Sequence, residues 1–204
     1  MKKKLLFFIT VLLISCKKDK EERAIIPKYW QKFSVVENIH KNINFKKMNS
    51  ETEFSILYDS STLKPKTNNI LFLSDTKIDF KDTLDIKKQR FLRNRNCSAY
   101  FFKSDTLSVG IMNSDGFGGS GFKISVFKDN YKIDYATFTD VEPFKNKKPK
   151  LIFDYKKLIL NKKKYNLNDS IFGYIEFKCL DNDSYAKPVY RYGKGYFRAK
   201  IEKY

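Results

Sequence analysis

Residues 122–139 read FKISVFKDNYKIDYATFT, and this stretch decides the fold class. Apolar and polar side chains alternate on both sides of Asp129-Asn130, as they do in two β-strands that bury one face, and this pair favours a tight turn between the strands. Residues 99–102 and 106–111 are two more short runs of aromatic and β-branched side chains. We therefore expect residues 99–139 to form an antiparallel meander.

Similar runs recur through the rest of the chain, and Gly, Pro, Asn, Asp or Ser residues bound each of them. They lie at residues 54–58, 70–73, 158–161, 170–178 and 196–201. Apolar residues at helical spacing predict a short helix over residues 27–40, where Pro27 suits the first helical position. The expected fold class is all-β, an antiparallel β-sandwich preceded by a short N-terminal helix or tether.

Two segments near the C-terminus share the frame Gly-Tyr-apolar-charged-apolar-Lys. They are residues 173–178 and 195–200. Strands that follow each other closely in the chain usually lie side by side, so we expect these two to be antiparallel neighbours. The sequence does not fix their register.

Residues 158–175 resemble the strand-turn-strand pattern of immunoglobulin-like sandwich modules in envelope lipoproteins. The resemblance rests on the alternation around Leu158 and Leu160 and on a turn that ends at Asp169. Such modules commonly have Gly before the Asp, whereas this chain has Asn168, which also fits a turn. The resemblance implies an immunoglobulin-like form of the sandwich.

One segment interrupts the strand pattern. Residues 141–150 contain two prolines and four lysines, a composition that a central strand does not tolerate. We expect a possible seam there, within a β-sandwich body that spans residues 29–204.

The N-terminus carries a targeting signal. Lys2, Lys3 and Lys4 precede ten uncharged residues, 5–14, which is the layout of a secretory signal peptide and is too short to span a bilayer. The following Ser15-Cys16 completes a match to the lipobox of bacterial lipoproteins. That resemblance implies removal of residues 1–15, attachment of a diacylglycerol and a palmitate-type acyl chain to Cys16, and a place in the outer membrane. The alternative is an ordinary secretory signal with a chance Cys.

Residues 16–28 are expected to be the lipidated Cys and a flexible tether. Residues 17–23 are Lys-Lys-Asp-Lys-Glu-Glu-Arg, without an apolar side chain. A solvated tether explains this run. The run also resembles, in part, the surface-export signal of some Gram-negative lipoproteins, so both a periplasmic and a surface-facing position stay open.

The chain is strongly basic, with 41 Lys and Arg against 23 Asp and Glu and a formal net charge of +18. Its most concentrated positive segment beyond the leader is residues 87–95. That segment is a possible anion patch for an anionic glycan or a lipid headgroup, formed by Lys87, Lys88, Arg90, Arg93 and Arg95. The alternative is a solvated loop. An extracytoplasmic location makes nucleic acid an unexpected partner.

The sequence contains few of the residue patterns that catalytic sites use. A single histidine, His40, excludes every scheme that needs two imidazoles, and no metal-ligand spacing or cofactor motif is present. Residues 116–121 match Gly-x-Gly-x-x-Gly, but a strand pattern follows where a nucleotide site needs a helix, so a hairpin connection is the better interpretation. The acidic residues lie mostly in turn contexts, which leaves a carboxylate-based hydrolase as an alternative only.

Two cysteines remain after Cys16. In an oxidising compartment, Cys97 and Cys179 are a possible disulfide, and two buried free thiols are the alternative.

Three functions stay open at this point. The first is a non-enzymatic binding or structural module, held on the membrane by its lipid, with an envelope protein or glycan as its partner. The second is binding of an anionic glycan or lipid headgroup through residues 87–95, and the third is the carboxylate-based hydrolase.

Overall fold

The computed structural model describes residues 29–52, 64–75, 96–102, 105–114, 118–139, 150–182 and 188–204. They form ten β-strands in one sheet, one short 3-10 helix and one short α-helix, which confirms the all-β class. The strand expected at residues 54–58 and nearly all of the possible seam at residues 141–150 lie outside this part of the chain.

The sheet is built from two long and eight shorter strands. Their bounds are β1 (Gln31–Lys32), β2 (Ser34–Val35), β3 (Leu71–Asp75), β4 (Ser98–Phe102), β5 (Thr106–Ser114), β6 (Gly118–Phe127), β7 (Asn130–Thr139), β8 (Leu151–Leu160), β9 (Ser170–Asp181) and β10 (Val189–Glu202). The 3-10 helix η1 spans Glu37–Lys41, and α1 spans Ile43–Asn49. Across the sheet the order is β1-β7-β6-β5-β4-β10-β9-β8-β2, and β3 pairs with β10 outside this path.

The predicted meander is confirmed, because β4, β5, β6 and β7 pair in succession and antiparallel. The turn between β6 and β7 lies one position earlier than the sequence suggested. Phe127 pairs with Asn130, so Lys128 and Asp129 make the turn, and Lys128 takes a positive φ of 52°. Asn130, one of the two predicted turn residues, is therefore the first residue of β7.

The two similar segments near the C-terminus are neighbours, as predicted. They belong to β9 and β10, which pair antiparallel from Val189 opposite Asp181 to Lys200 opposite Ser170. Gly173 lies opposite Phe197 in this register. In the connection between β8 and β9, Asn168 takes a φ of 68°, as expected for a turn residue.

Strand β10 joins the two halves of the sheet. One edge pairs with β9, while the other pairs antiparallel with β3 and, near its end, parallel with β4. Gly195 has a φ of 153°, and a Cβ there would lie 2.6 Å from the Cα atom of Ile70. Only glycine allows the backbone before β3 to approach β10 this closely.

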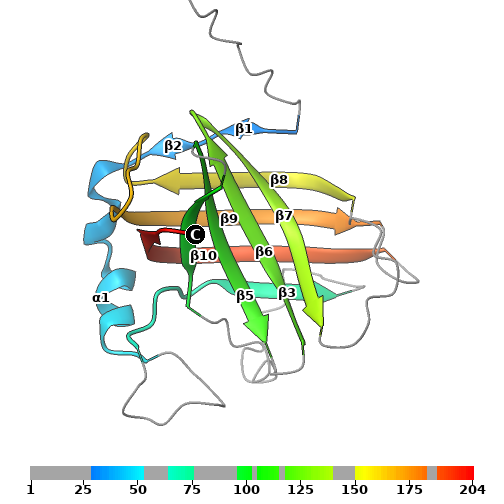
Figure 1. Ribbon diagram of the computed structural model, residues 1–204. Coiled ribbons are helices and arrows are strands. Elements are labelled where there is room, and N and C mark those ends of the chain that lie inside the picture. The colour runs from blue at the N-terminus through cyan, green and yellow to red at the C-terminus, as the bar shows by residue number, and fades with distance from the viewer. Residues whose placement is uncertain are drawn as a thin grey trace, which may run out of the picture.

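The sheet folds over so that β5, β6 and β7 cross in front of β8, β9 and β10 (Figure 1). Alternate side chains of both layers point into one apolar core, which is the period-two pattern expected of strands. Its largest fully buried side chains include Tyr131, Phe122, Phe177 and Phe197. The helix α1 adds a smaller cluster, in which Phe45 and Met48 are buried next to the outer face of β9 and β10.

Two glycines make room for aromatic rings within the core. Gly173 on β9 lies opposite Phe197, and Gly193 on β10 lies opposite Phe177. A Cβ at either glycine would collide with the ring across the strand pair. The two rings therefore occupy the space that a side chain at each glycine would need.

The helix predicted over residues 27–40 is wrong for the residues that the structure describes. Residues 31–32 and 34–35 are the short strands β1 and β2, and only η1 is helical. The apolar spacing that suggested a helix is outweighed by backbone pairing, because β1 pairs with β7 and β2 with β8. His40 lies exposed in η1, and its Nδ1 is 3.1 Å from the carbonyl oxygen of Glu37.

Two strands are longer than the sequence indicated. β8 begins at Leu151 and β10 at Val189, several residues before the runs that predicted them. Charged residues at Asp154, Lys156 and Lys157 hid the alternation of β8, and a register shift between Phe153 and Tyr155 breaks its period.

We predict that Gly173→Ala and Gly193→Ala each lower the free energy of unfolding by about 1–3 kcal/mol, the usual cost of overpacking a filled core. Urea denaturation of the purified chain measures the change. Gly110→Ala is the matched control, because its Cβ would meet only the Ser98 hydroxyl, at 3.0 Å, and that side chain can turn away. Losses equal to that of Gly110→Ala would contradict the packing described here.

Candidate functional site

Several residues singled out from the sequence lie outside the part of the chain that the structure describes. These are the signal peptide, Cys16 with its tether, and the possible anion patch of Lys87, Lys88, Arg90, Arg93 and Arg95. Of the glycine-rich segment, residues 118–121 belong to strand β6. A strand therefore follows the first glycine, where a nucleotide site needs a helix. The hairpin connection expected over residues 116–121 is wrong for residues 118–121, because these pair with β5 or β7 as part of β6.

Cys97 and Cys179 are both free in the structure. Cys97 donates its backbone N–H to Thr67, whose carbonyl accepts from Arg198, whereas Cys179 lies opposite Arg191. Arg198 and Arg191, the β10 residues near the two cysteines, are seven residues apart, which is roughly 23 Å along a strand. A disulfide needs Cα atoms within about 7 Å, so this fold holds the two thiols too far apart for a bridge.

The surroundings of both thiols disfavour the reactive thiolate form. Burial raises the pKa of Cys97 and of Cys179 to about 12. We predict that iodoacetamide at pH 8 modifies neither cysteine in the folded chain, because the thiolate is the nucleophile. In urea without reductant, a version of the chain that begins at Lys17 should gain two adducts by intact mass. No adducts under those conditions would indicate a disulfide.

The two ends of the sheet meet only in part. β1 pairs with β7 only at Tyr131 and Asn130, and β2 pairs with β8 only at Ile159 and Leu160. Among the described residues no strand pairs with the rest of the outer edges of β7 and β8. A cavity of about 560 Å³ lies between these edges, and we call it the β7–β8 groove.

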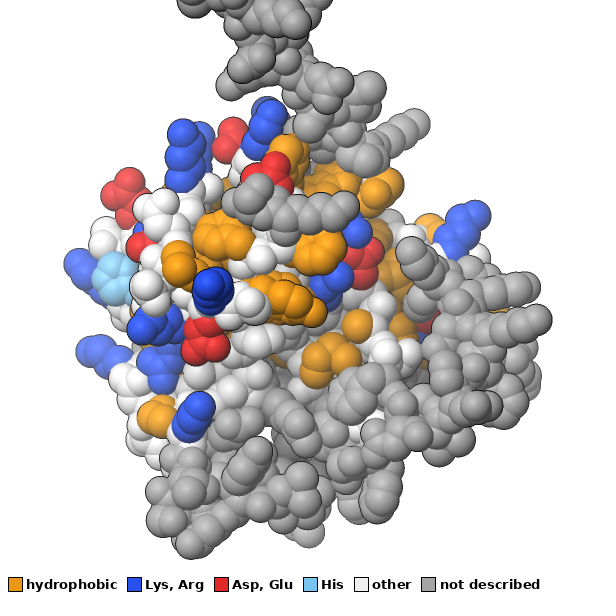
Figure 2. All heavy atoms as spheres, in the orientation of Figure 1, with side chains coloured by type: hydrophobic (Ala, Val, Ile, Leu, Met, Phe, Trp, Pro, Cys, Tyr) orange, Lys and Arg blue, Asp and Glu red, His pale blue; other side chains and the backbone are white. Residues whose placement is uncertain are grey.

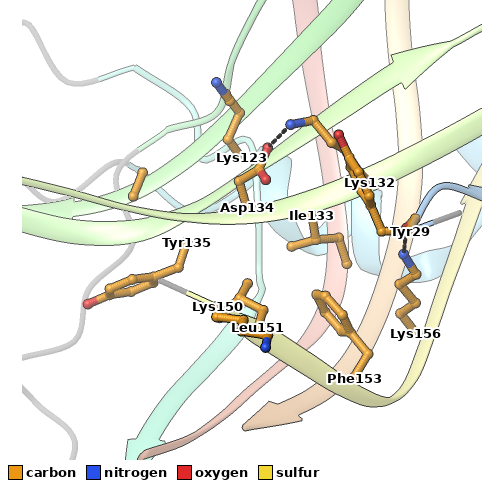
Figure 3. A pocket seen from close by; sticks show the side chains of 11 residues that line it. Tyr29, Lys123, Lys132, Ile133, Asp134, Tyr135, Lys150, Leu151, Phe153 and Lys156 are labelled. Atoms are coloured by element: carbon orange, nitrogen blue, oxygen red, sulfur yellow. Dashed lines mark hydrogen bonds and ion pairs between the residues drawn. The ribbon is translucent and has the colours of Figure 1, made fainter. Parts of the chain in front are cut away.

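The β7–β8 groove is lined by aromatic, aliphatic and basic side chains (Figure 3). Its lining residues are Tyr29, Lys123, Lys132, Ile133, Asp134, Tyr135, Ala136, Lys150, Leu151, Phe153 and Lys156. Four lysines against one aspartate give this lining a formal charge of +3. A groove with apolar walls and several cations suits a ligand that has both an apolar part and negative charge.

Strand β7 separates two kinds of surface within the groove. Lys132 and Asp134 lie on one side of the strand, where they form an ion pair of 2.7 Å, and Lys123 of β6 lies next to them (Figure 3). Ile133 and Tyr135 lie on the other side, facing β8. The alternation of β7, which predicted the strand, therefore also gives its free edge a charged side and an apolar side.

Lys156 is a partly buried cation of the groove. Its Nζ donates to the carbonyl oxygen of Tyr29 at 2.6 Å and lies 4.9 Å from the ring centre of Phe153. The register shift at Asp154 changes the parity of β8, so that Phe153 and Lys156 point to the same face of the sheet. Burial lowers the pKa of Lys156, and the charge of Asp134 opposes this effect only in part.

A buried ion pair supports the apolar side of the groove. The guanidinium of Arg191 lies 3.4 Å from the ring centre of Tyr135, and its Nε and Nη2 donate to Asp181 Oδ2 at 2.9 and 2.7 Å. Phe72 stacks against the same tyrosine ring, with ring centres 6.4 Å apart. Tyr135 is therefore held in place by its surroundings before any ligand binds.

Elsewhere on the same side of the molecule, basic side chains are scattered among acidic and hydrophobic ones (Figure 2). Their spread agrees with a lysine-rich composition that serves solubility in general. The β7–β8 groove differs, because its lysines surround one concave apolar surface. Within the described residues, no group of three His, Cys, Asp or Glu side chains could hold a metal ion.

A second hollow, of about 460 Å³, lies between η1 and the outer face of β8, β9 and β10. Three of its polar side chains, Asn42, Tyr174 and Tyr196, already take part in hydrogen bonds of the fold. Asn42 Nδ2 donates to the Tyr196 hydroxyl at 3.1 Å, and the Tyr174 hydroxyl donates to Glu176 at 2.6 Å. This hollow is therefore explained by the packing of η1 on the sheet, and the β7–β8 groove is the better candidate site.

The groove was not predicted from the sequence. Lys132 and Lys156 each sit within a strand, where a lone lysine usually faces water, and Lys150 follows the proline-rich segment. The available signal was the alternation of Lys132, Asp134 and their apolar neighbours, which marks β7 as a strand with one polar side. Nothing in the sequence placed that strand at a free edge next to β8.

Comparison of the chain with protein-family models, with curated proteins and with solved structures finds no match. In the part of the chain that the structure describes, no helix is long and apolar enough to cross a membrane.

We predict that Lys156→Met raises the free energy of unfolding at neutral pH. The lowered pKa means that the folded chain binds the lysine proton less tightly than the unfolded chain does, so the charged form costs stability. The cost is full below the folded-state pKa and disappears as the pH rises toward the unfolded value of about 10.4. The advantage of Lys156→Met should shrink over that range.

Denaturation curves at several pH values between 7 and about 10.4 test this prediction. Lys157→Met is the control, because Lys157 is the exposed neighbour on the other face of β8 and the substitution removes the same charge. Equal effects of the two substitutions at every pH would show that Lys156 carries no burial cost.

Proposed function

We propose that this protein is a lipid-anchored module of the bacterial envelope that binds an anionic ligand in the β7–β8 groove. The single observation that carries the proposal is the groove itself, in which four lysines and one aspartate surround aromatic and aliphatic walls. The proposal includes no catalytic step, because the one carboxylate in the lining is paired with Lys132.

The anchor in this proposal is Cys16, the lipobox cysteine. Two or three acyl chains hold a protein on a membrane durably, whereas one chain binds only marginally. Residues 17–28 would then be a tether between the outer membrane and the β-sheet body. We further propose that the two crossing layers act as a β-sandwich of the immunoglobulin-like kind, which the single core shared by both layers supports.

The basic segment at residues 87–95 is a second candidate for contact with an anionic glycan or a lipid headgroup. Three of the six arginines of the chain lie in it, and arginine forms paired hydrogen bonds to phosphate or sulfate. The groove is preferred, because its cations converge on a defined concave surface and the case for the segment rests on composition alone.

We predict that Lys132→Gln with Lys150→Gln weakens binding of a fluorescently labelled deca-aspartate at least tenfold. The reason is that these two lysines stand on opposite walls of the groove. Fluorescence anisotropy at 0.1 M salt, where the Debye length is about 10 Å, measures the affinity. Lys46→Gln with Lys47→Gln is the matched control, because it removes the same charge from exposed positions on α1.

The control pair should change the affinity less than twofold. If both pairs weaken binding to the same extent, the net charge of the chain attracts the probe and the groove is not the site.

For the anchor, we predict that cells grown with an alkyne-bearing fatty acid label the wild-type chain and leave Cys16→Ala unlabelled. Gel fluorescence after coupling of a dye measures the label. Equal labelling of the two chains, or none of the wild type, would contradict lipidation at Cys16.

A further inference from the structure

Besides charged side chains, the outer edge of β7 presents backbone groups that no described strand pairs with. β7 has ten residues, of which β1 pairs with two. The next residues along β7, from Lys132 to Ala136, line the groove and have no strand partner on that edge among the described residues. An edge of this kind presents a row of backbone N–H and C=O groups that an added strand can pair with.

The side chains next to this edge alternate as those of a strand partner would. Lys132 and Asp134 stand on the outer side with Lys123, while Ile133 and Tyr135 stand on the inner side (Figure 3). A strand placed beside β7 would point every second side chain toward Lys123, Lys132 and Asp134, a group with a formal charge of +1. Its other side chains would point toward the apolar surface that Leu151 and Phe153 complete.

We propose that the ligand of the β7–β8 groove is an extended peptide segment in which acidic and apolar residues alternate, bound as an additional strand on β7. This inference rests on the proposed function and names the class of its ligand. Backbone pairing supplies a binding mode that is independent of side-chain identity, and the two sides of β7 select the pattern. Lys156 and Lys150 favour acidic residues at the ends of such a segment.

The charge of the groove argues against a second copy of this chain as the occupant. Like charges placed opposite each other on neighbouring strands are unfavourable, and this chain carries a net charge of +18. Lysines on an exposed edge are a known protection against self-pairing of strands. The same lysines attract an acidic strand, so the edge excludes its own copies and accepts a partner of opposite charge.

The length of the site sets the length of the segment. The groove-lining part of β7 runs from Lys132 to Ala136, five residues or about 17 Å at the rise of an antiparallel strand. A segment of about eight residues covers this length and leaves a residue or two at each end for Lys156 and Lys150.

The test compares three labelled peptides on the full-length chain, purified in a non-ionic detergent. The first peptide has four Asp and four Val residues in strict alternation. The second has the same sequence with its four central amides N-methylated, which removes donors from both edges and keeps every charge. The third has the same composition in two blocks, four Asp and then four Val. Anisotropy gives the three affinities.

Strand addition predicts that the alternating peptide binds at least tenfold more tightly than either control peptide. It also predicts that Lys132→Gln with Lys150→Gln weakens the alternating peptide at least tenfold, while Lys46→Gln with Lys47→Gln changes it less than twofold. N-methylated and block peptides that bind within threefold of the alternating one would overturn the inference.

The outcomes separate this inference from the function on which it rests. If the groove variant loses deca-aspartate and the three peptides bind alike, the groove binds anions without strand addition. If the groove and control variants behave alike with every probe, the groove is not an anion site and both proposals are wrong. Tighter binding of a sulfated oligosaccharide or of phosphatidylglycerol vesicles, with displacement of the peptide, would overturn the peptide as the ligand.

Discussion

The structure depends on the backbone pairing of β10. This strand pairs with β9 along twelve residues on one edge and holds β3 and β4 on the other. Its glycines allow the close approach, because Gly193 makes room for Phe177 and Gly195 makes room for the backbone of Ile70. Without the pairing of β10 with strands on both of its edges, the meander of β4–β7 and the layer of β8–β10 would each leave an apolar face in water.

The position of the groove follows from the pairing of β10. Once β10 connects the two halves, β7 and β8 become the far ends of the sheet, and the fold brings these ends back together. The segment that closes the gap contributes only the two-residue strands β1 and β2. Most of β7 therefore has no strand partner on its outer edge among the residues that the structure describes, and the side chains of β7 and β8 form the walls of a cavity.

The sequence predicted those elements whose pattern is local. Alternation predicted β4–β7 and β9, and the shared Gly-Tyr frame predicted the pairing of β9 with β10. Elements that depend on distant partners were missed, since β1 and β2 are too short to carry a pattern. Lys156 shows the same limit, because its direction depends on a register shift at Asp154 that only the pairing with β9 reveals.

Composition alone does not distinguish the groove from the rest of the surface. The net charge of +18 is spread over the whole chain, whereas the groove adds a formal charge of only +3. What distinguishes the groove is the combination of a free strand edge, a fixed aromatic wall at Tyr135 and a partly buried ammonium at Lys156. A partly buried cation of this kind costs stability, and shifted pKa values are common at functional sites.

The proposed binding mode requires that the outer backbone edge of β7, which has no strand partner between Lys132 and Ala136 among the described residues, is also free in the whole chain. Amide hydrogen exchange followed by NMR tests it most directly, because an amide without a backbone partner exchanges much faster than its paired neighbours. The account predicts that alternate amides between Lys132 and Ala136 exchange rapidly while those between them, which pair with β6, are protected like the amides of β9. Uniform protection along β7 would mean that another segment already occupies the edge, and would contradict the account.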